Sequence, residues 1–383
     1  LYSENIRTRG KKALTSGKYE VHQPELSRDH RSFFLTTNEV EPGQRQGYRL
    51  DLTTGKTTRL TPDAGGYEMT PSPDNRWIAL RYSRSNHPWE AYLQEARPGA
   101  GEVRITDKSE STLFASYPWR APELIRFRDK DGQEVYARLF RPATQAATRP
   151  GAIFIHGAGY LQDALQYWSD EYFREYFFEN LLTDEGYTVM DIDYRGSAGY
   201  GRDWRTAIYR HMGGKDLDDI VDGAAYMGDS LNVDPARIGI WGGSYGGFLT
   251  LMALFTRPGT FVCGAALRSV TDWAHYNQGY TSDILNEPAT DSLAYLRSSP
   301  IYFAAGLRDH LLMCHGMQDT NVNFQDIVRL TEKLIELGKR HWVLASYPME
   351  NHGFADPSSW QDEYHRIHDL FTGDLLQRGP AQP

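Results

Sequence analysis

The chain has 383 residues, of which 40% are hydrophobic and 13% aromatic, so it can bury a sizeable core and lies well away from disordered compositions. This length favours two domains over one. The formal net charge of −9 argues against nucleic acid or an anionic membrane as a partner. No apolar run reaches the roughly 18 residues that a membrane-spanning helix needs.

The first 115 or so residues carry an internal repeat with an offset of 45 residues. Ser27-Arg-Asp29-His-Arg31 returns as Ser72-Pro-Asp74-Asn-Arg76, and a strand is expected directly after each. Arg59-Leu-Thr61 returns in the same way as Arg104-Ile-Thr106. A period near 45 with several strands per unit is typical of β-propeller blades. Two unrelated hairpins of similar sequence are the alternative.

Residues 1–118 have room for about two blades, whereas a propeller needs at least about four to close. We therefore expect an incomplete propeller segment, either because the chain is the C-terminal part of a longer protein or because its strands pair with something outside it. Truncation is the favoured explanation. The chain also opens at Leu1 without a methionine or a signal peptide, so we expect its natural start to be missing.

From residue 119 onward the pattern changes to apolar strands alternating with helical stretches, which is typical of a parallel sheet with crossover helices. A hairpin is expected first, at 124–128 and 134–140. Further strands are expected at 151–155, 187–192, 237–241, 261–267, 311–314 and 342–346. Helices are expected at 168–183, 217–230, 247–256, 324–337 and 360–376. The predicted fold class is an α/β-hydrolase domain over 119–383, with Pro118 and Pro122 marking the boundary to the propeller segment.

The two cysteines, Cys263 and Cys314, each lie in a short apolar run that is expected to form a buried strand. Neighbouring strands rarely place two cysteines in disulfide geometry, so both are expected to be free thiols in the core. The cellular compartment therefore cannot be inferred from them.

Residues 242–246 read Gly-Gly-Ser-Tyr-Gly and match the G-x-S-x-G nucleophile elbow. In this device a serine, here Ser244, lies on a strained turn between a strand and a helix. Glycine is expected two residues before and after it, because the two backbones come too close for Cβ atoms. An apolar strand before the motif and an apolar helix after it favour a working elbow over a glycine-rich loop.

A serine nucleophile needs a histidine base, and the base needs an anion that holds its tautomer. In this fold the chain order is serine, acid, histidine. His352 is expected to be the base, because it follows the late strand at 342–346 in a loop before the last helix. Asp319 is expected to be the acid, because it follows the strand at 311–314 and a glycine turn. Asp309 precedes that strand, and Asp326 falls in the next helix.

An oxyanion hole requires two aligned donors. One is expected to be the backbone N–H of Tyr245, the residue after the nucleophile. The other is expected from the loop His156-Gly-Ala-Gly159, which is similar to the HGGG-type loop and makes Gly157 the donor. His156 is interpreted as a residue that orients this loop, without acid–base chemistry.

The motifs in this order resemble the prolyl oligopeptidase family, specifically its dipeptidyl-peptidase-IV-like and acylaminoacyl-peptidase-like branches. The resemblance covers about residues 119–375, and the repeats fit the propeller that these peptidases carry in front. The matching segments are Asp193–Gly201, Trp241–Gly247, His315–Val322 and His352–Phe354. The resemblance places Ser244, Asp319 and His352 as the catalytic triad.

The resemblance also implies a proline-accepting pocket and a residue that binds the substrate backbone. The flat, apolar pyrrolidine ring has no N–H, so aromatic walls bind it without leaving donors unpaired. The implied wall consists of Val270, Trp273, Tyr276 and Tyr280, completed by Tyr245 and Val322. Asn321 matches the position that hydrogen-bonds the substrate carbonyl next to the scissile residue. The alternative is that these aromatic residues only pack the core.

Two departures from the family pattern bear on function. The dipeptidyl-peptidase-IV-like branch has an oxyanion tyrosine where this chain has His156, so the hole is expected to rely on backbone donors. The acidic residues that bind a free substrate amine belong to propeller parts outside this chain, so exo- versus endo-cleavage stays open.

The function expected from the sequence is a serine peptidase that cuts short peptides after Pro or Ala through an acyl-enzyme, with peptide as partner and no metal or cofactor. The alternatives are an esterase on the same fold, an acylaminoacyl-peptidase-type exopeptidase and a catalytically silent binding module. The missing propeller part and a second copy of the chain are further candidate partners. Family resemblance favours a periplasmic or secreted location, with a cytoplasmic one left open.

Overall fold

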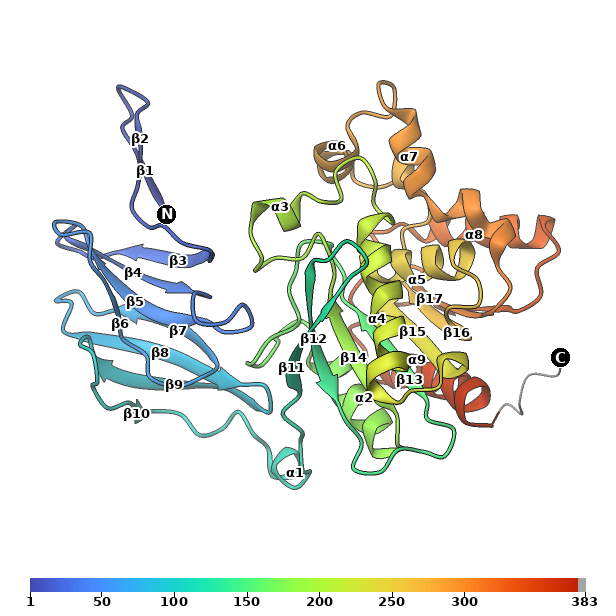
Figure 1. Cartoon of the computed structure of the whole chain (residues 1–383), viewed down its shortest axis with the longest axis horizontal. Helices are drawn as coiled ribbons and strands as arrows, with labels where there is room; N and C mark the ends of the chain where they lie inside the picture. Colours follow the sequence, from blue (N-terminus) through green and yellow to red (C-terminus); the bar gives the residue numbers. More distant parts are fainter. Residues whose placement is uncertain (378–383) are drawn as a thin grey trace. The chain divides into compact units, whose positions relative to one another are not determined.

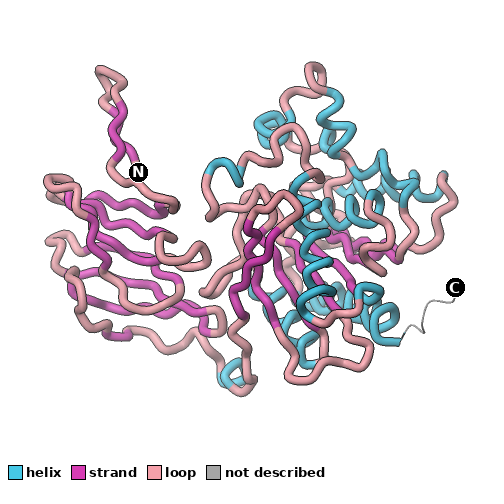
Figure 2. The backbone as a smooth tube through the Cα atoms, viewed as in Figure 1, coloured by secondary structure: helices cyan, strands magenta, loops and turns pink. Residues whose placement is uncertain are grey.

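The computed structural model describes residues 1–377, and these form two compact units. Unit 1 comprises Leu1–Leu124, Leu165–Phe173 and Gly199–Gly201, and unit 2 comprises Ile125–Ala164, Arg174–Ala198 and the chain from Arg202 onward. Strands predominate in unit 1, whereas helices and strands alternate in unit 2 (Figure 2). The last six residues of the domain expected over 119–383, residues 378–383, lie outside the described residues.

Unit 1 contains two four-stranded antiparallel sheets in which consecutive strands are neighbours (Figure 1). The first consists of β3 (Val21–Leu26), β4 (Ser32–Thr37), β5 (Gln46–Asp51) and β6 (Thr57–Arg59). The second consists of β7 (Gly66–Pro71), β8 (Trp77–Arg84), β9 (His87–Glu95) and β10 (Val103–Arg104). Beside them stand a hairpin, β1 (Tyr2–Glu4) with β2 (Lys11–Ala13), and the short helix α1 (Thr112–Ala115). Four strands per unit are the pattern of a propeller blade, which confirms the predicted segment of about two blades.

The internal repeat corresponds to the same turn built twice. Ser27 Oγ donates to the carboxylate of Asp29 at 2.7 Å, and Ser72 Oγ donates to the carboxylate of Asp74 at 2.6 Å. The residue after each aspartate has a positive φ, 56° and 57°. Each turn leads directly into the second strand of its blade, so the sequence repeat marks equal structural positions.

The threonines that close the repeat also have equal roles. Thr61 Oγ1 accepts the backbone N–H of Gly47, and Thr106 Oγ1 accepts that of Ala91, both at 2.9 Å. The two threonines are 45 residues apart and the two donors 44, and such a repetition is not expected of two unrelated hairpins. The blade interpretation therefore stands over that alternative.

Unit 2 is built on an eight-stranded sheet in the order β11-β12-β14-β13-β15-β16-β17-β18. Its strands are β11 (Glu123–Arg128), β12 (Glu134–Phe140), β13 (Gly151–Ile155), β14 (Thr188–Asp193), β15 (Ile238–Gly243), β16 (Cys263–Leu267), β17 (His310–Gly316) and β18 (Trp342–Tyr347). The strands from β14 to β18 along this order are parallel, and β12 pairs antiparallel with β14. This mostly parallel sheet confirms the α/β-hydrolase prediction. The loops that follow β13, β15, β17 and β18 consequently share one edge of the sheet.

Helices cover both faces of this sheet (Figure 1). They are α2 (Phe173–Asp184), α3 (Arg202–Arg205), α4 (Lys215–Leu231), α5 (Tyr245–Thr256), α6 (Gln278–Leu285), α7 (Ser292–Ser298), α8 (Phe324–Glu336) and α9 (Pro357–Phe371), with short 3-10 turns at Pro235–Arg237, Trp273–His275 and Pro300–Gly306 and a π-helix at Thr372–Gln377. On β15, Trp241 packs on Phe178 of α2 and Phe371 of α9, with ring centroids 5.7 and 5.8 Å apart. The adjacent Ile240 belongs to the same core cluster as Phe248 of α5. Successive strand residues therefore pack on opposite helical layers.

Several helices differ from the sequence prediction. The helix expected over 168–183 begins only at Phe173, because Trp168 packs edge-on against Phe114 at 5.7 Å within unit 1. The last helix begins earlier than expected, at Pro357, since the Asp356 side chain accepts the N–H of Ser358 at its start. Helices α6 and α7 were not predicted.

Both cysteines are buried and free, as predicted. They lie on the neighbouring strands β16 and β17, but Cys314 is opposite Leu267, at the far end of β16 from Cys263. Four residues of strand separate the two positions, roughly 13 Å. Disulfide geometry is therefore out of reach.

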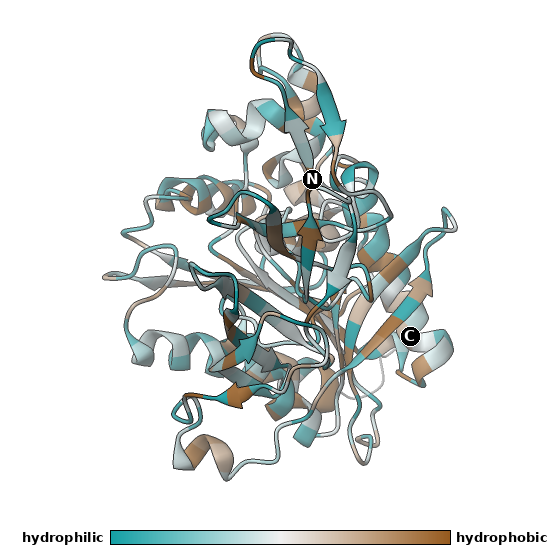
Figure 3. Ribbon diagram, turned by 90° about the vertical axis from the view of Figure 1, so that its left-hand side faces the viewer, coloured by the Kyte–Doolittle hydropathy of each residue, from teal (hydrophilic) through white to brown (hydrophobic). Residues whose placement is uncertain are grey.

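Strand hydropathy follows burial in unit 1. Along β8, Ile78 and Leu80 are buried while their neighbours Trp77 and Ala79 are exposed, so one face of this blade is apolar. Hydrophobic and hydrophilic bands alternate along strands in Figure 3.

None of the helices within residues 1–377 combines the length and the apolar character needed to cross a membrane.

Candidate active site

Ser244 lies at the turn between β15 and α5, where the sequence predicts the nucleophile elbow. Its φ of 57° and ψ of −114° are strained for a residue with a Cβ atom. The turn is held by the backbone N–H of Ser244, which donates to the carbonyl of Leu267 at 2.8 Å. This backbone is the strand-to-helix elbow of an α/β-hydrolase.

The glycines on either side of Ser244 meet the end of β13. A Cβ atom on Gly242 or on Gly246 would overlap the carbonyl oxygen of Ile155. On Gly246 it would also come within 3.0 Å of the carbonyl oxygen of His156. The close approach predicted from the G-x-S-x-G spacing is therefore present, and it involves a second strand, which the motif alone does not reveal.

His352 and Asp319 are hydrogen-bonded to each other, with Nδ1 of the histidine 2.7 Å from Oδ2 of the aspartate. The other carboxylate oxygen of Asp319 accepts the backbone N–H groups of Asn321 and Val322, each at 2.8 Å. His315 Nε2 lies 3.3 Å from the Oδ2 atom and donates to the carbonyl of Val322 at 2.9 Å. The carboxylate is thus oriented from both of its oxygens.

These contacts shift the acidity of Asp319. Burial alone raises its pKa, but the hydrogen bonds from His315, His352 and the backbone of Val322 outweigh burial, and the net pKa lies well below its ordinary value. The carboxylate therefore stays ionised at neutral pH. An ionised carboxylate at Nδ1 leaves the other ring nitrogen of His352 as the one that can accept a proton.

Two other aspartates considered from the sequence have structural roles. Asp309 precedes β17 and accepts the backbone N–H of Gly259 at 3.2 Å, at the opposite edge of the sheet from the elbow. Asp326 lies in α8 and accepts the backbone N–H of Thr271 at 2.6 Å.

Within residues 1–377, no group of three or more His, Cys, Asp or Glu side chains is arranged to hold a metal ion.

The predicted oxyanion loop packs against the elbow. A Cβ atom on Gly159 would lie 3.0 Å from the ring of Tyr245, so the loop after β13 touches the residue after the nucleophile. The backbone of Tyr245 begins α5, whose N-terminus favours negative charge. Gly157 lies two residues before that contact, in the loop that follows β13. The roles of the Tyr245 and Gly157 amides as donors stay predictions.

His156 is fully buried, as a loop-orienting residue requires. Its ring stacks on Tyr194 with centroids 4.4 Å apart, and Nε2 lies 2.8 Å from Ser197 Oγ. Nδ1 lies 2.9 Å from the carbonyl oxygen of Gly157. These contacts tie the predicted oxyanion loop to the segment after β14.

The residues of the implied proline pocket form one aromatic group. The rings of Trp273, Tyr276 and Tyr280 lie 5.5 to 6.0 Å apart between centroids. The Tyr276 hydroxyl donates to Asn321 Oδ1 at 2.6 Å, which joins this group to the loop of the catalytic acid. Val270 and Val322, the apolar members, are both buried.

Two members of the implied wall belong mainly to the core. Trp273 and Tyr245 are buried and pack on Phe248 of α5, with centroids 5.1 and 5.0 Å away. Tyr276 and Tyr280 are only half-buried. The core-packing alternative thus describes Trp273 and Tyr245, whereas Tyr276 and Tyr280 retain the exposure that a binding wall needs.

Comparison with known proteins identifies the family. A model described as the prolyl oligopeptidase family matches residues 174–377, more than half of the chain. The chain belongs to the prolyl oligopeptidase family. A second model, described as the dipeptidyl peptidase IV (DPP IV) N-terminal region, matches residues 1–89 and agrees with the two blades of unit 1.

Relatives within the family share less than a third of their residues with this chain. Human dipeptidyl peptidase 8 is 29% identical over 376 residues, covering 94% of this chain and 41% of the relative. Dipeptidyl-aminopeptidase B of Aspergillus niger is 29% identical over 388 residues, covering 95% and 42%. The crystal structure of Porphyromonas gingivalis dipeptidyl peptidase 4 superposes with a TM-score of 0.88 at 26% identity, covering 98% of this chain and 52% of that one. The chain therefore spans about half or less of the length of these family members.

The sequence analysis did not identify Asp216, a buried acid beside the elbow. Asp216 accepts the Tyr245 hydroxyl at 2.7 Å and the backbone N–H of Gly213 at 3.0 Å. Burial raises its pKa to about 6, against the lowering effect of those two hydrogen bonds. The hydrogen bond to Asp216 holds the Tyr245 ring in place. The backbone amide of the same residue is the predicted oxyanion donor. An aspartate in the first turn of α4 is an ordinary helix feature, so the sequence held no signal for it.

Proposed function

We propose that this chain carries the catalytic domain of a serine peptidase that cuts peptides after Pro or Ala, with Ser244, His352 and Asp319 as its triad. The observation that carries the proposal is the 2.7 Å hydrogen bond between His352 Nδ1 and an ionised, doubly anchored Asp319. Asp319 and His352 follow the neighbouring strands β17 and β18, and the strained elbow of Ser244 follows β15, which β16 separates from β17; all three lie at one edge of the parallel part of the sheet.

The proposed reaction begins when His352 Nε2 takes the hydroxyl proton of Ser244 as its oxygen attacks the peptide carbonyl. The backbone amides of Tyr245 and Gly157 stabilise the negative charge that develops on the carbonyl oxygen. His352 then gives the proton to the leaving amine, and an acyl-enzyme on Ser244 remains. Water, deprotonated by His352, hydrolyses the acyl-enzyme and restores Ser244.

Specificity in this proposal comes from Tyr276 and Tyr280, whose half-buried rings offer apolar faces to a proline or alanine side chain. Asn321 presents its amide to the substrate backbone, since its side-chain oxygen already accepts from Tyr276. The remaining Nδ2 group is a donor, which suits a substrate carbonyl.

The parent protein is proposed to be an exopeptidase that releases dipeptides, because the relatives that match most of this chain are named dipeptidyl peptidases or dipeptidyl-aminopeptidases. In this view residues 1–118 are propeller blades and residues 119–383 the catalytic domain. The natural partner is a peptide substrate.

The test is mass spectrometry after treatment of the protein with a fluorophosphonate, which reacts with activated serines. We expect one adduct, on Ser244, that is lost in Ser244→Ala and falls at least 100-fold in rate in His352→Ala. His365→Ala, which removes an exposed histidine on α9, is the control and keeps the adduct. Absence of any adduct on folded protein would refute the proposal.

A further inference from the structure

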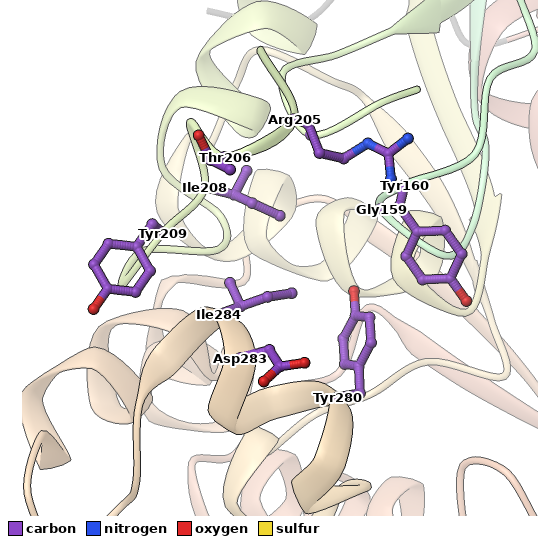
Figure 4. Close-up of a pocket in the computed structure, with 10 residues that line it drawn as sticks. Gly159, Tyr160, Arg205, Thr206, Ile208, Tyr209, Tyr280, Asp283 and Ile284 are labelled. Carbon is purple, nitrogen blue, oxygen red and sulfur yellow. The ribbon is translucent and has the colours of Figure 1, made fainter. Parts of the chain in front are cut away.

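A cavity of about 380 Å³ lies in unit 2 behind the wall formed by Tyr280. Its lining comes from three places: the oxyanion loop, the segment after β14 that includes α3, and helix α6 (Figure 4). The lining residues are Gly159, Tyr160, Gly196, Arg205, Thr206, Ile208, Tyr209, Tyr280, Asp283 and Ile284. Because Gly159 and Tyr280 each belong to a predicted part of the active site, the cavity adjoins the place where a substrate would be cut.

Two donors in this cavity lack partners. The Nε atom of Arg205 and the hydroxyl of Tyr280 are both buried, and within residues 1–377 neither has a hydrogen-bond partner. Unpaired buried donors are uncommon in folded proteins because each loses its hydration without compensation. In Figure 4 the Tyr280 hydroxyl points toward the side of the cavity on which Arg205 and Tyr160 lie. The lining of one cavity thus carries two buried donors without a partner.

The charge of the cavity is carried by two residues of unequal exposure. Asp283 is exposed and lies on α6, where water screens its carboxylate. Arg205 is partly buried, and its guanidinium forms no ion pair within the described chain. Ile208 and Ile284 make part of the cavity wall apolar. The ring centroids of Tyr160 and Tyr280 lie 6.0 Å apart.

We propose that this cavity is a specificity subsite for a carboxylate-bearing substrate side chain, which Arg205 and Tyr280 bind together. An acceptor-only group satisfies both donors, and the planar guanidinium matches a carboxylate. The apolar walls accommodate the methylene groups of a glutamate. Burial raises the pKa of the Tyr280 hydroxyl, so this group remains a donor at any physiological pH.

The inference rests on the proposed peptidase function and extends it, because it adds a second side-chain preference to the Pro or Ala preference. A side chain on either side of the scissile bond could carry the carboxylate into a cavity at this position. The test therefore uses two matched pairs of substrates: Glu-Pro-anilide against Gln-Pro-anilide, and Ala-Pro-Glu against Ala-Pro-Gln. Glutamine has nearly the same shape as glutamate, but it lacks the charge and has an NH2 donor in place of one acceptor oxygen.

In one of the two pairs we expect kcat/KM for the glutamate substrate to exceed that for glutamine about tenfold or more, the size of a hydrogen bond to a charged group. Arg205→Gln should bring this ratio near one, Arg205→Lys should retain part of it, and Tyr280→Phe should lower it a few-fold. Arg202→Gln changes an exposed arginine of the same helix and should leave the ratio unchanged. A ratio that is near one in the wild type, or that survives Arg205→Gln, overturns the proposal.

A binding measurement separates this inference from the proposed function. Calorimetry of the same peptides on Ser244→Ala, with and without Arg205→Gln, reports glutamate preference without any turnover. Fluorophosphonate labelling of Ser244 combined with equal binding of both peptides would refute the subsite alone. Absence of labelling combined with a glutamate preference that depends on Arg205 would refute the catalytic proposal and leave the subsite in place.

Discussion

Gly246 lies two residues after Ser244, where the carbonyl oxygen of Ile155 occupies the space that a Cβ atom would need. We expect Gly246→Ala to push β13 away from the elbow, at a cost of about 1–3 kcal/mol in the free energy of unfolding. Activity toward a Pro-anilide should fall more than 100-fold, since a small misplacement of the reacting groups has that effect. Kinetics and thermal unfolding check both results.

The control for that variant is Gly373→Ala in the C-terminal π-helix. A Cβ atom at this position meets nothing within 4 Å, so stability and activity should stay near those of the wild type. Equal losses in both variants would mean that the sensitivity is general to glycine rather than particular to the elbow.

Asp319 offers a test of charge at the residue scale. Asp319→Asn keeps the shape of the side chain but removes the charge that orients and stabilises His352, so kcat should fall about 10³- to 10⁴-fold. A variant that retains a tenth of the wild-type kcat would exclude Asp319 as the catalytic acid.

The effect of Asp319→Asn on the free energy of unfolding should depend on pH. The pKa of Asp319 is lowered in the folded state, so its contribution to stability is present above the ordinary pKa near 4 and is lost as pH falls below it. The gap in unfolding free energy between wild type and Asp319→Asn should therefore narrow between about pH 5 and pH 2. Denaturant titrations at a series of pH values measure this.

At the scale of elements, Arg268 joins the segment after β16 to the elbow and to the last helix. Its guanidinium lies 3.0 Å from the place of a Cβ on Gly243, 3.5 Å from Glu363 of α9, and over the ring of Phe354 in the His352 loop. The side chain is 11% exposed, and that of Glu363 is fully buried. The Arg268 side chain therefore contacts both the elbow that carries Ser244 and the loop that carries His352.

We expect Arg268→Met to lower the free energy of unfolding by about 1–3 kcal/mol, because it leaves the buried carboxyl of Glu363 without the donor that faces it. Arg366→Met is the matched control: its partner Asp362 also lies on α9, but both side chains are nearly half exposed, and the expected loss is below about 1 kcal/mol. Urea denaturation of the two variants gives the comparison. Equal losses would contradict a bracing role.

At the scale of the whole molecule, unit 2 buries several carboxyl groups whose pKa values are raised. Burial raises the pKa of Asp216 to about 6, that of Glu363 to about 7 and that of Asp219 to about 8, in each case against hydrogen bonds that lower it. These groups keep a proton in the folded state that the unfolded chain has already lost above about pH 5. Folding is consequently linked to proton binding.

The sign of that linkage predicts a decline in stability at alkaline pH. The contribution of raised carboxyl pKa values is complete below about pH 4 and is lost as pH rises to about 8. The melting temperature should therefore fall between pH 6 and pH 9, and Asp219→Asn should make this fall shallower. A melting temperature that is constant or rises over that range would contradict the prediction.

The sequence predicted the sheet strands, the two blades and the family because these leave local patterns. A 45-residue repeat, alternating apolar runs and a glycine–serine elbow are all readable within short windows. Helix boundaries were less accurate where distant contacts compete with local preference, as at residues 168–172, which pack within unit 1 instead of extending α2. Helices α6 and α7 are short and weakly patterned, and they were missed.

By itself, the sequence determined the family and the candidate triad, since Ser244, Asp319 and His352 follow strands in the order that an α/β-hydrolase requires. Only the tertiary structure decided which neighbours act on them. The Ile155 carbonyl under the elbow, Asp216 at the Tyr245 hydroxyl and Arg205 in the cavity all come from segments distant in sequence. Parallel strands bring such segments to one edge, and no local pattern encodes contacts made across that edge.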